Sequence, residues 1–72
     1  MNKEEFIKKW DEIRQLRGSG VNLEVIVGEH TRIFANAYGF SESYGEPSYV
    51  LLYYNSAWIA MVACRDVSNI YT

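Results

Sequence analysis

The residues best suited to chemistry are few in this 72-residue chain, and they are scattered along it. Cys64 is the only thiol and His30 the only imidazole, and they fall on two different predicted turns. A nucleophilic Cys–His pair needs both side chains within hydrogen-bond distance. An isolated cysteine is more often a buried small hydrophobic residue, and an isolated histidine on a turn is a surface residue. We therefore predict that the protein is not an enzyme.

The sequence patterns that bind metals and phosphate are also missing. One cysteine and one histidine do not supply the ligands of a zinc site. Glu42 and Glu46 share a loop, but they lack the Asp, Asn and Gly spacing of a calcium loop. Gly18-Ser19-Gly20 follows a predicted helix, whereas phosphate groups bind where a helix begins. We expect no metal ion and no cofactor.

Aromatic and basic residues remain as candidates for a functional site. Such residues can bind a ligand without catalysing a reaction. Aromatic side chains make up 15% of the chain. Arg65 offers a cation, and Phe40, Tyr44 and Tyr71 offer rings on which RNA bases can stack. However, residues 18–72 hold two basic against five acidic residues, a formal charge of −3. Because cation–phosphate contacts supply most non-specific affinity for nucleic acid, this charge disfavours a broad nucleic-acid surface.

The first element that positions these residues is an amphipathic helix, predicted over residues 3–17. Its apolar residues recur at three- and four-residue spacing, which gives one apolar stripe. They are Phe6, Ile7, Trp10, Ile13 and Leu16. Asn2 and Glu5 have the spacing of a capping box, and Gly18 can take the left-handed conformation that ends a helix. We expect the helix to pack on the rest of the protein through its tryptophan.

The remainder of the chain, about residues 21–72, has the pattern of β structure. Its first strand begins where Val21, Leu23 and Val25 alternate with polar residues. The later strands are predicted over residues 32–40, 49–54, 57–64 and 67–71. Polar turns and loops separate them at residues 28–31, 41–47, 55–56 and 65–66. Gly39 is the expected position of a bend or bulge.

The strands over residues 49–54 and 57–64 are apolar on both faces. In a small isolated sheet, only the face that packs on the helix is expected to be apolar. A sheet that packs one face on a helix has its other face in water, so its strands alternate. We therefore expect the second apolar face to line a closed barrel or to meet another subunit. The residues predicted for strands that self-associate are Trp58, Ile59, Met61, Val67 and Ile70. Trp58 is also expected to pack in the core, as is Trp10.

Length and composition predict one domain over residues 1–72. A chain of this size buries only about 60% of its unfolded surface, and one cysteine cannot form an internal disulfide. The longest apolar run is too short to cross a membrane, and residues 3–5 do not resemble a signal peptide. We expect a cytoplasmic protein without membrane contact, stabilised by packing or by copies of itself.

The predicted order of a helix, a strand, a bent strand, two more strands and a short strand resembles the Sm-like family. Residues 21–28 are similar to the first strand of that family and its closing glycine. Residues 32–40 resemble its second strand, and residues 50–52 with the turn at 55–56 resemble its third. Residues 61–70 resemble its fourth strand, short turn and fifth strand.

The resemblance implies a mainly β fold, with an N-terminal helix before a five-stranded, strongly bent antiparallel barrel. It also implies a homo-oligomeric ring, in which the fourth strand of one subunit pairs with the fifth strand of the next. Members bind single-stranded RNA through two turns at the pore; Arg65 lies at the later turn and Phe40 at the earlier one. Another SH3-like barrel, and an α+β fold with one helix on an antiparallel sheet, remain open.

Two functions remain open, and both act by binding. The leading one is a self-associating barrel that binds single-stranded RNA through Arg65 and nearby aromatic rings. The alternative is a protein-interaction module, an adaptor or inhibitor, that uses its acidic barrel surface and the tyrosine-rich loop over residues 41–47. The mass in solution is the first measurement that separates them.

Overall fold

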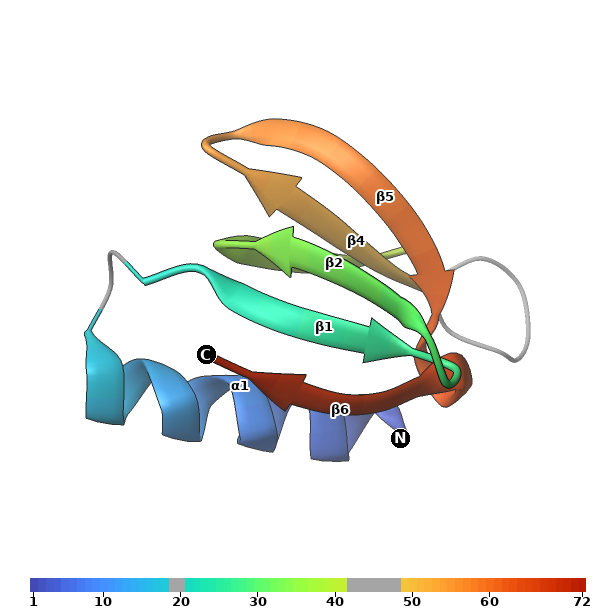
Figure 1. The fold of residues 1–72 in the computed structure, drawn as a ribbon, viewed down its shortest axis with the longest axis horizontal. Helices are drawn as coiled ribbons and strands as arrows, with labels where there is room; N and C mark the ends of the chain where they lie inside the picture. Colours follow the sequence, from blue (N-terminus) through green and yellow to red (C-terminus); the bar gives the residue numbers. More distant parts are fainter. Residues whose placement is uncertain (19–20, 42–48) are drawn as a thin grey trace.

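One helix and six strands make up the fold, which is mostly β with an α+β character (Figure 1). The computed structural model describes residues 1–18, 21–41 and 49–72. The strands form two antiparallel three-stranded sheets, sheet A in the order β2-β1-β6 and sheet B in the order β3-β4-β5. The elements are α1 (Lys3–Arg17), β1 (Leu23–Val27), β2 (Thr31–Ala35), β3 (Ala37–Ser41), β4 (Tyr49–Tyr54), β5 (Ala57–Ala63), the 3-10 turn η1 (Cys64–Asp66) and β6 (Val67–Tyr71).

The helix α1 covers the predicted residues, and its start is fixed by the predicted capping box. The Asn2 side chain accepts a hydrogen bond from the Glu5 backbone N–H at 2.8 Å, and the Glu5 carboxylate accepts one from the Asn2 backbone N–H at 3.1 Å. Gly18 follows the last turn with a φ of 92°. Leu16, predicted in the apolar stripe, is 83% exposed, since the C-terminal end of α1 extends past the end of β6 (Figure 1).

The core lies where α1 and the inner faces of the two sheets meet. Its buried residues are Phe6, Trp10, Leu23, Val25, Ala35, Val50, Leu52, Cys64, Val67 and Ile70. The aromatic side chains of α1 pack against β3: the Trp10 and Tyr38 ring centroids are 4.9 Å apart, and those of Phe6 and Phe40 are 5.8 Å apart. The prediction that Trp10 packs the helix onto the sheets is confirmed.

The strand predicted over residues 32–40 is divided into β2 and β3, so the described residues hold six strands and not the predicted five. These strands form two three-stranded sheets, and no closed barrel is detected among them. The division lies at Asn36 and not at Gly39, which pairs within β3 with Leu51. Contacts from distant residues hold Asn36 there. Its backbone N–H donates to the Tyr53 carbonyl at 2.9 Å, and its side chain exchanges two hydrogen bonds with Asn55, at 2.9 and 3.1 Å.

The C-terminal part of α1 also contacts this bend. The Arg14 guanidinium donates hydrogen bonds to the carbonyl of Asn36 and, at 2.6 Å, to the carbonyl of Val21. One side chain therefore connects the helix to the strand division and to the segment that enters β1. Hydrogen bonds from a charged donor are stronger than neutral ones, so this contact stabilises the bend.

The prediction that Trp58 packs in the core is wrong, because 61% of this residue is exposed. The register between β4 and β5 shifts at a bulge: Leu52 pairs with Ala60, whereas Tyr53 pairs with Trp58, so Ile59 is the extra residue. Residues opposite each other on paired strands share a face. Leu52 and Ala60 therefore face the core, and Trp58 lies with Tyr53 on the outer face.

Candidate functional site

The two strands β5 and β6 each have one edge without a neighbouring strand in the described part of the chain. β5 pairs with β4 only, and β6 pairs with β1 only. The other two outer strands, β2 and β3, follow each other directly through Asn36. An unpaired edge presents backbone N–H and C=O groups that can pair with another chain.

Neither of these two edges carries the charge or proline that usually protects an edge strand. β5 consists of seven apolar residues, and β6 has the sequence Val-Ser-Asn-Ile-Tyr. Between Arg32 and Arg65 the sequence holds charged residues only at Glu42 and Glu46. Sheet B therefore contains no charged residue in its three strands, and its edge is open to strand pairing.

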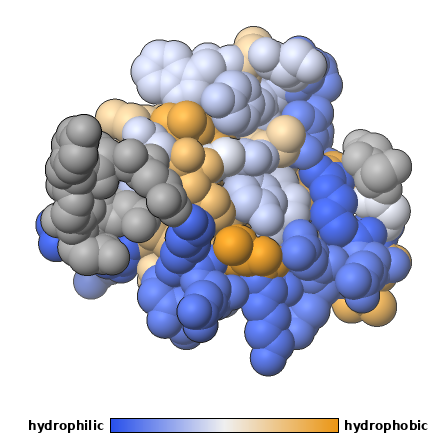
Figure 2. Space-filling model, turned by 180° about the vertical axis from the view of Figure 1, so that it is seen from behind, coloured by the Kyte–Doolittle hydropathy of each residue, from blue (hydrophilic) through white to orange (hydrophobic). Residues whose placement is uncertain are grey.

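The exposed apolar side chains of the predicted self-association residues gather on β5. Trp58, Ile59 and Met61 are 61%, 44% and 51% exposed. Val67 and Ile70 on β6 are buried in the core, so only their backbone lies at the edge. Figure 2 shows hydrophilic residues along the bottom, over α1, and up the right-hand side, with pale and hydrophobic residues in the middle and at the top.

The RNA-binding residues predicted from the sequence are not all brought together. Arg65 is exposed on η1, which begins directly after β5. Phe40 lies at the same end of sheet B, because it pairs with Val50 and Val50 pairs with Val62. Tyr71 lies at the opposite end of β6 from η1 (Figure 1). Tyr44 and the rest of the loop after Ser41 are outside the described residues.

Phe40 is engaged in packing and is not an open stacking platform. Its ring is half-buried and meets the rings of Phe6 and Tyr38 edge-on. The Lys3 ammonium lies over it, 5.0 Å from the ring centroid. Of the three predicted residues that the structure describes, Arg65 is therefore the one whose position suits contact with a ligand at the η1 end.

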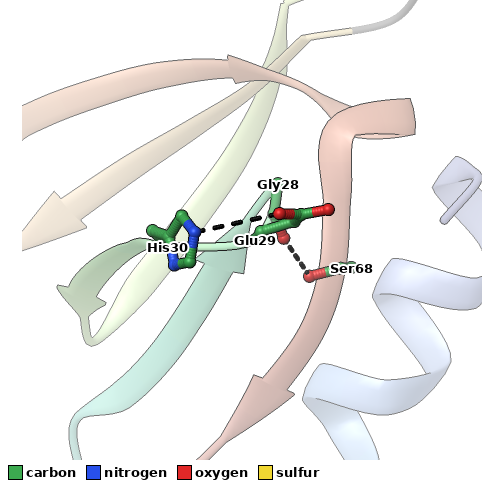
Figure 3. A network of polar contacts seen from close by, with 4 residues as sticks. All are labelled: Gly28, Glu29, His30 and Ser68. Atoms are coloured by element: carbon green, nitrogen blue, oxygen red, sulfur yellow. Dashed lines mark hydrogen bonds and ion pairs between the residues drawn. The ribbon is translucent and has the colours of Figure 1, made fainter.

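The β1–β2 turn contacts both η1, which carries Arg65, and the start of β6; Figure 3 shows its contact with Ser68 of β6. The Gly28 backbone N–H donates to the Asp66 carbonyl at 2.9 Å, and the Ser68 hydroxyl donates to the Gly28 carbonyl at 2.9 Å. The N-terminal amine of Met1 donates to the Val67 carbonyl at 2.5 Å. Met1 and the β1–β2 turn thus contact η1 and the start of β6 from two distant parts of the chain, so the backbone on either side of Arg65 is held in place.

Cys64 and His30 lie in different surroundings, as the sequence predicted. Cys64 is 3% exposed and belongs to the core. His30 is on the β1–β2 turn with 93% of its side chain exposed, and its Nε2 lies 3.8 Å from a Glu29 carboxylate oxygen. Within residues 1–18, 21–41 and 49–72, no three His, Cys, Asp or Glu side chains are grouped as a metal site requires. None of the helices described there is long and apolar enough to span a membrane.

A groove between α1 and β6 is a feature that the sequence reasoning missed. It is lined by Lys9, Ile13, Leu16, Arg17, Ile70, Tyr71 and Thr72. Leu16 and Tyr71 are 83% and 51% exposed, so large apolar side chains stand on both sides of the groove. The only signal in the sequence was the length of the apolar stripe, which runs one turn further than the core needs.

Comparisons with known proteins return no match: no family model, no curated protein and no solved structure is similar to this chain at a significant level.

Tyr38 gives a prediction about alkaline pH. Burial, and to a smaller extent the negative charge of Asp11, raise the pKa of the Tyr38 hydroxyl above its ordinary value of 10.0. The unfolded chain then loses this proton more easily than the folded protein. The stabilising contribution is complete below pH 10 and is lost as the pH rises through the folded-state pKa. In urea titrations, Tyr38→Phe should lose less stability above about pH 10 than the parent; equal losses would contradict this.

Proposed function

We propose that the protein is a non-enzymatic binding protein with an Sm-like barrel, which assembles into a ring and binds single-stranded RNA beside Arg65. The observation that carries this proposal is the pair of uncharged, unpaired edges on β5 and β6. A ring of identical subunits needs two different surfaces that fit each other, one at each end of the subunit. Two open strand edges meet this requirement.

The order of the strands supports the Sm-like assignment. From β6 the pairing runs through β1 to β2, continues across Asn36 into β3, and ends with β4 and β5. The five predicted strands therefore follow one another in a single bent series, with the second strand divided. A helix precedes the series, and the short turn η1 joins its last two strands. This order of elements supports the resemblance, although the described strands form two three-stranded sheets and not the five-stranded barrel that it implies.

Assembly through β5 and β6 would compensate for the small size of the domain. Strand pairing between copies would satisfy the backbone groups of both edges and would cover Ile59 and Met61, which are 44% and 51% exposed. Apolar burial contributes about 25 cal/mol per Å². The lack of charge on both strands means that no like charges oppose this contact.

Arg65 is the residue proposed to contact RNA. A ring repeats this residue once in every subunit, and a repeated cation around one axis attracts phosphate more strongly than a single one. Asp66, its neighbour, is also exposed and reduces this attraction. RNA binding is therefore expected to be sensitive to salt.

The experiment measures mass first and RNA affinity second. Light scattering should give a mass several times the 8.3 kDa of a single chain. A labelled U-rich or A-rich RNA is then titrated at two salt concentrations, with the parent, Arg65→Gln and Arg32→Gln. Arg32 is the matched control, because it is exposed and its Nε lies 3.3 Å from the Glu24 carboxylate. Arg65→Gln should weaken binding by about tenfold or more and flatten the salt dependence, while Arg32→Gln should not.

Two results would overturn parts of this proposal. A monomer at all accessible concentrations would contradict the ring and the RNA site that depends on it. A ring that does not bind RNA at low salt would contradict the RNA part only. In that case a protein ligand for the outer face of sheet B becomes the next hypothesis.

A further inference from the structure

The groove between α1 and β6 has apolar walls and an exposed apolar rim. Figure 1 shows β6 running along α1, with the helix extending past the end of the strand. Ile70 is the buried residue of the groove, and Ile13 is half-buried in it. Leu16 is 83% exposed, which makes it the most exposed large apolar residue in the part of the chain that the structure describes. The groove therefore offers apolar surface that a partner could cover.

The charge of the groove restricts the chemistry of such a partner. Its described lining residues include Lys9 and Arg17 and no acidic side chain, although the chain as a whole has a net charge of −2. Lys9 is half-buried in the middle of α1, and Arg17 is exposed at its last residue. Because the C-terminal end of a helix carries partial negative charge, a carboxylate is bound more favourably near Lys9 than near Arg17. The groove thus fits an apolar group with a carboxylate close to it.

The size of the groove and its two cations favour a peptide as the occupant. Its volume of about 210 Å³ is below the range of about 300–1,000 Å³ that is usual for small-molecule pockets. Segments that bind anionic lipid typically carry clusters of about four to eight basic residues, and nucleic acid is held by contacts with many phosphates. One large apolar side chain with a neighbouring carboxylate needs less space and less charge than any of these ligands.

We propose that the α1–β6 groove binds a short acidic segment of another protein, with a large apolar side chain against Leu16 and Ile13 and a carboxylate beside Lys9. Burial of the apolar side chain supplies affinity, and the charge contact selects acidic sequences. Both features recur in domains that recognise short peptides. This inference goes beyond the proposed function and does not depend on the ring or on RNA binding.

Selection from a displayed peptide library tests the preference of the groove. Random short peptides are selected on the parent, after removal of those that also bind Leu16→Ser. This variant loses the apolar rim at a position that is 83% exposed, so the core is not disturbed. The selected peptides should carry Asp or Glu next to a large apolar residue. A selection that yields basic or uncharged peptides, or none that distinguishes the parent from Leu16→Ser, would overturn the proposal.

Two neighbouring lysines provide matched variants for the best selected peptide. Lys9 lines the groove, whereas Lys8 is exposed elsewhere on α1. Each lysine follows a glutamate by four residues, so Lys9→Glu and Lys8→Glu make the same change of charge in similar surroundings. Fluorescence anisotropy with the labelled synthetic peptide should show affinity weaker by about tenfold or more for Lys9→Glu. Lys8→Glu should stay close to the parent, and equal losses in both variants would contradict binding in the groove.

Exchanging the charges between the partners separates a lost contact from a folding defect. A peptide in which lysine replaces the acidic residues should bind Lys9→Glu more tightly than it binds the parent, a gain that a misfolded variant cannot produce. No such gain would contradict the contact between Lys9 and a carboxylate.

Competing occupants are tested with the same variants. If anionic lipid vesicles or poly-U RNA displaced the peptide from the parent, and bound less well to Lys9→Glu but not to Lys8→Glu, the groove would be a phosphate site and the proposal would be wrong. A lower mass of Leu16→Ser than of the parent would show that another copy covers the groove, which would also overturn it. Failure of the peptide selection leaves the proposed ring and the Arg65 site unaffected.

Discussion

Replacing Trp10 with alanine is expected to lower the free energy of unfolding by about 3–5 kcal/mol. The indole ring is 3% exposed, and its centroid lies 5.7 Å from that of Phe6 and 4.9 Å from that of Tyr38. The Arg14 guanidinium lies over the same ring, 5.6 Å from its centroid. The substitution would leave a large cavity between α1 and β3, and the small core has few other contacts to compensate.

Urea denaturation at one fixed protein concentration measures this change, since the proposed self-association would make the apparent stability rise with the logarithm of protein concentration. Gln15→Ala is the control on the same helix, because Gln15 is exposed. It should change stability by no more than about 0.5 kcal/mol. A Trp10→Ala protein that unfolds at the same urea concentration as the parent would show that α1 does not depend on this contact.

Replacing Met61 with lysine is expected to convert the proposed assembly into monomers. Met61 is 51% exposed on β5, where a long side chain can extend into water without disturbing the core of one copy. In the paired state, the same lysine would lie in an apolar contact between copies and would lose part of its hydration. Natural edge strands use lysine in this way to prevent pairing.

The measurement is the mass by light scattering across a range of protein concentrations. Phe34→Lys is the matched control, because Phe34 is 57% exposed and lies on β2, outside the two proposed edges. It should keep the parent mass. The interface would have to be sought elsewhere if Met61→Lys kept the parent mass, or if both variants became monomers.

The elements that were predicted well are those determined by residues close together in the sequence, such as capping and turn residues. The limits of α1 follow from the capping box at Asn2 and Glu5 and from a glycine after the last turn. The β4–β5 hairpin follows from Asn55 and Ser56, which both have positive φ values, 50° and 69°. Asparagine accepts that conformation more readily than most residues, so the turn could be located from the sequence.

The features that were predicted wrongly depend on contacts between distant residues. The strand division at Asn36 depends on hydrogen bonds that Asn36 makes with Arg14, Tyr53 and Asn55, and no local sequence pattern indicates it. The exposure of Trp58 depends on a bulge that shifts the β4–β5 register. A periodic pattern shows that a strand is apolar on both faces, but it cannot show which face is covered.

The candidate site was predicted only in part for the same reason. The sequence indicated that the strands over residues 49–54 and 57–64, now β4 and β5, carry surplus apolar surface, and the exposed side chains of Ile59 and Met61 on β5 agree with that. It could not show that Tyr71 lies far from Arg65, because that separation depends on the direction of β6 after η1. The α1–β6 groove needs the helix and the last strand to be side by side, which no motif in either segment indicates.

The division at Asn36 has a consequence for symmetry. The proposed interface edges belong to different sheets, β5 to sheet B and β6 to sheet A, and Asn36 is the residue at which one sheet passes into the other. The angle between the sheets therefore sets the rotation from each subunit to the next. In a closed ring this rotation multiplied by the number of subunits is one full turn. The hydrogen bonds from Arg14 and Asn55, which fix the angle between the sheets, would thus help to determine the number of subunits in the ring. Neither residue lies on the two edges that would pair.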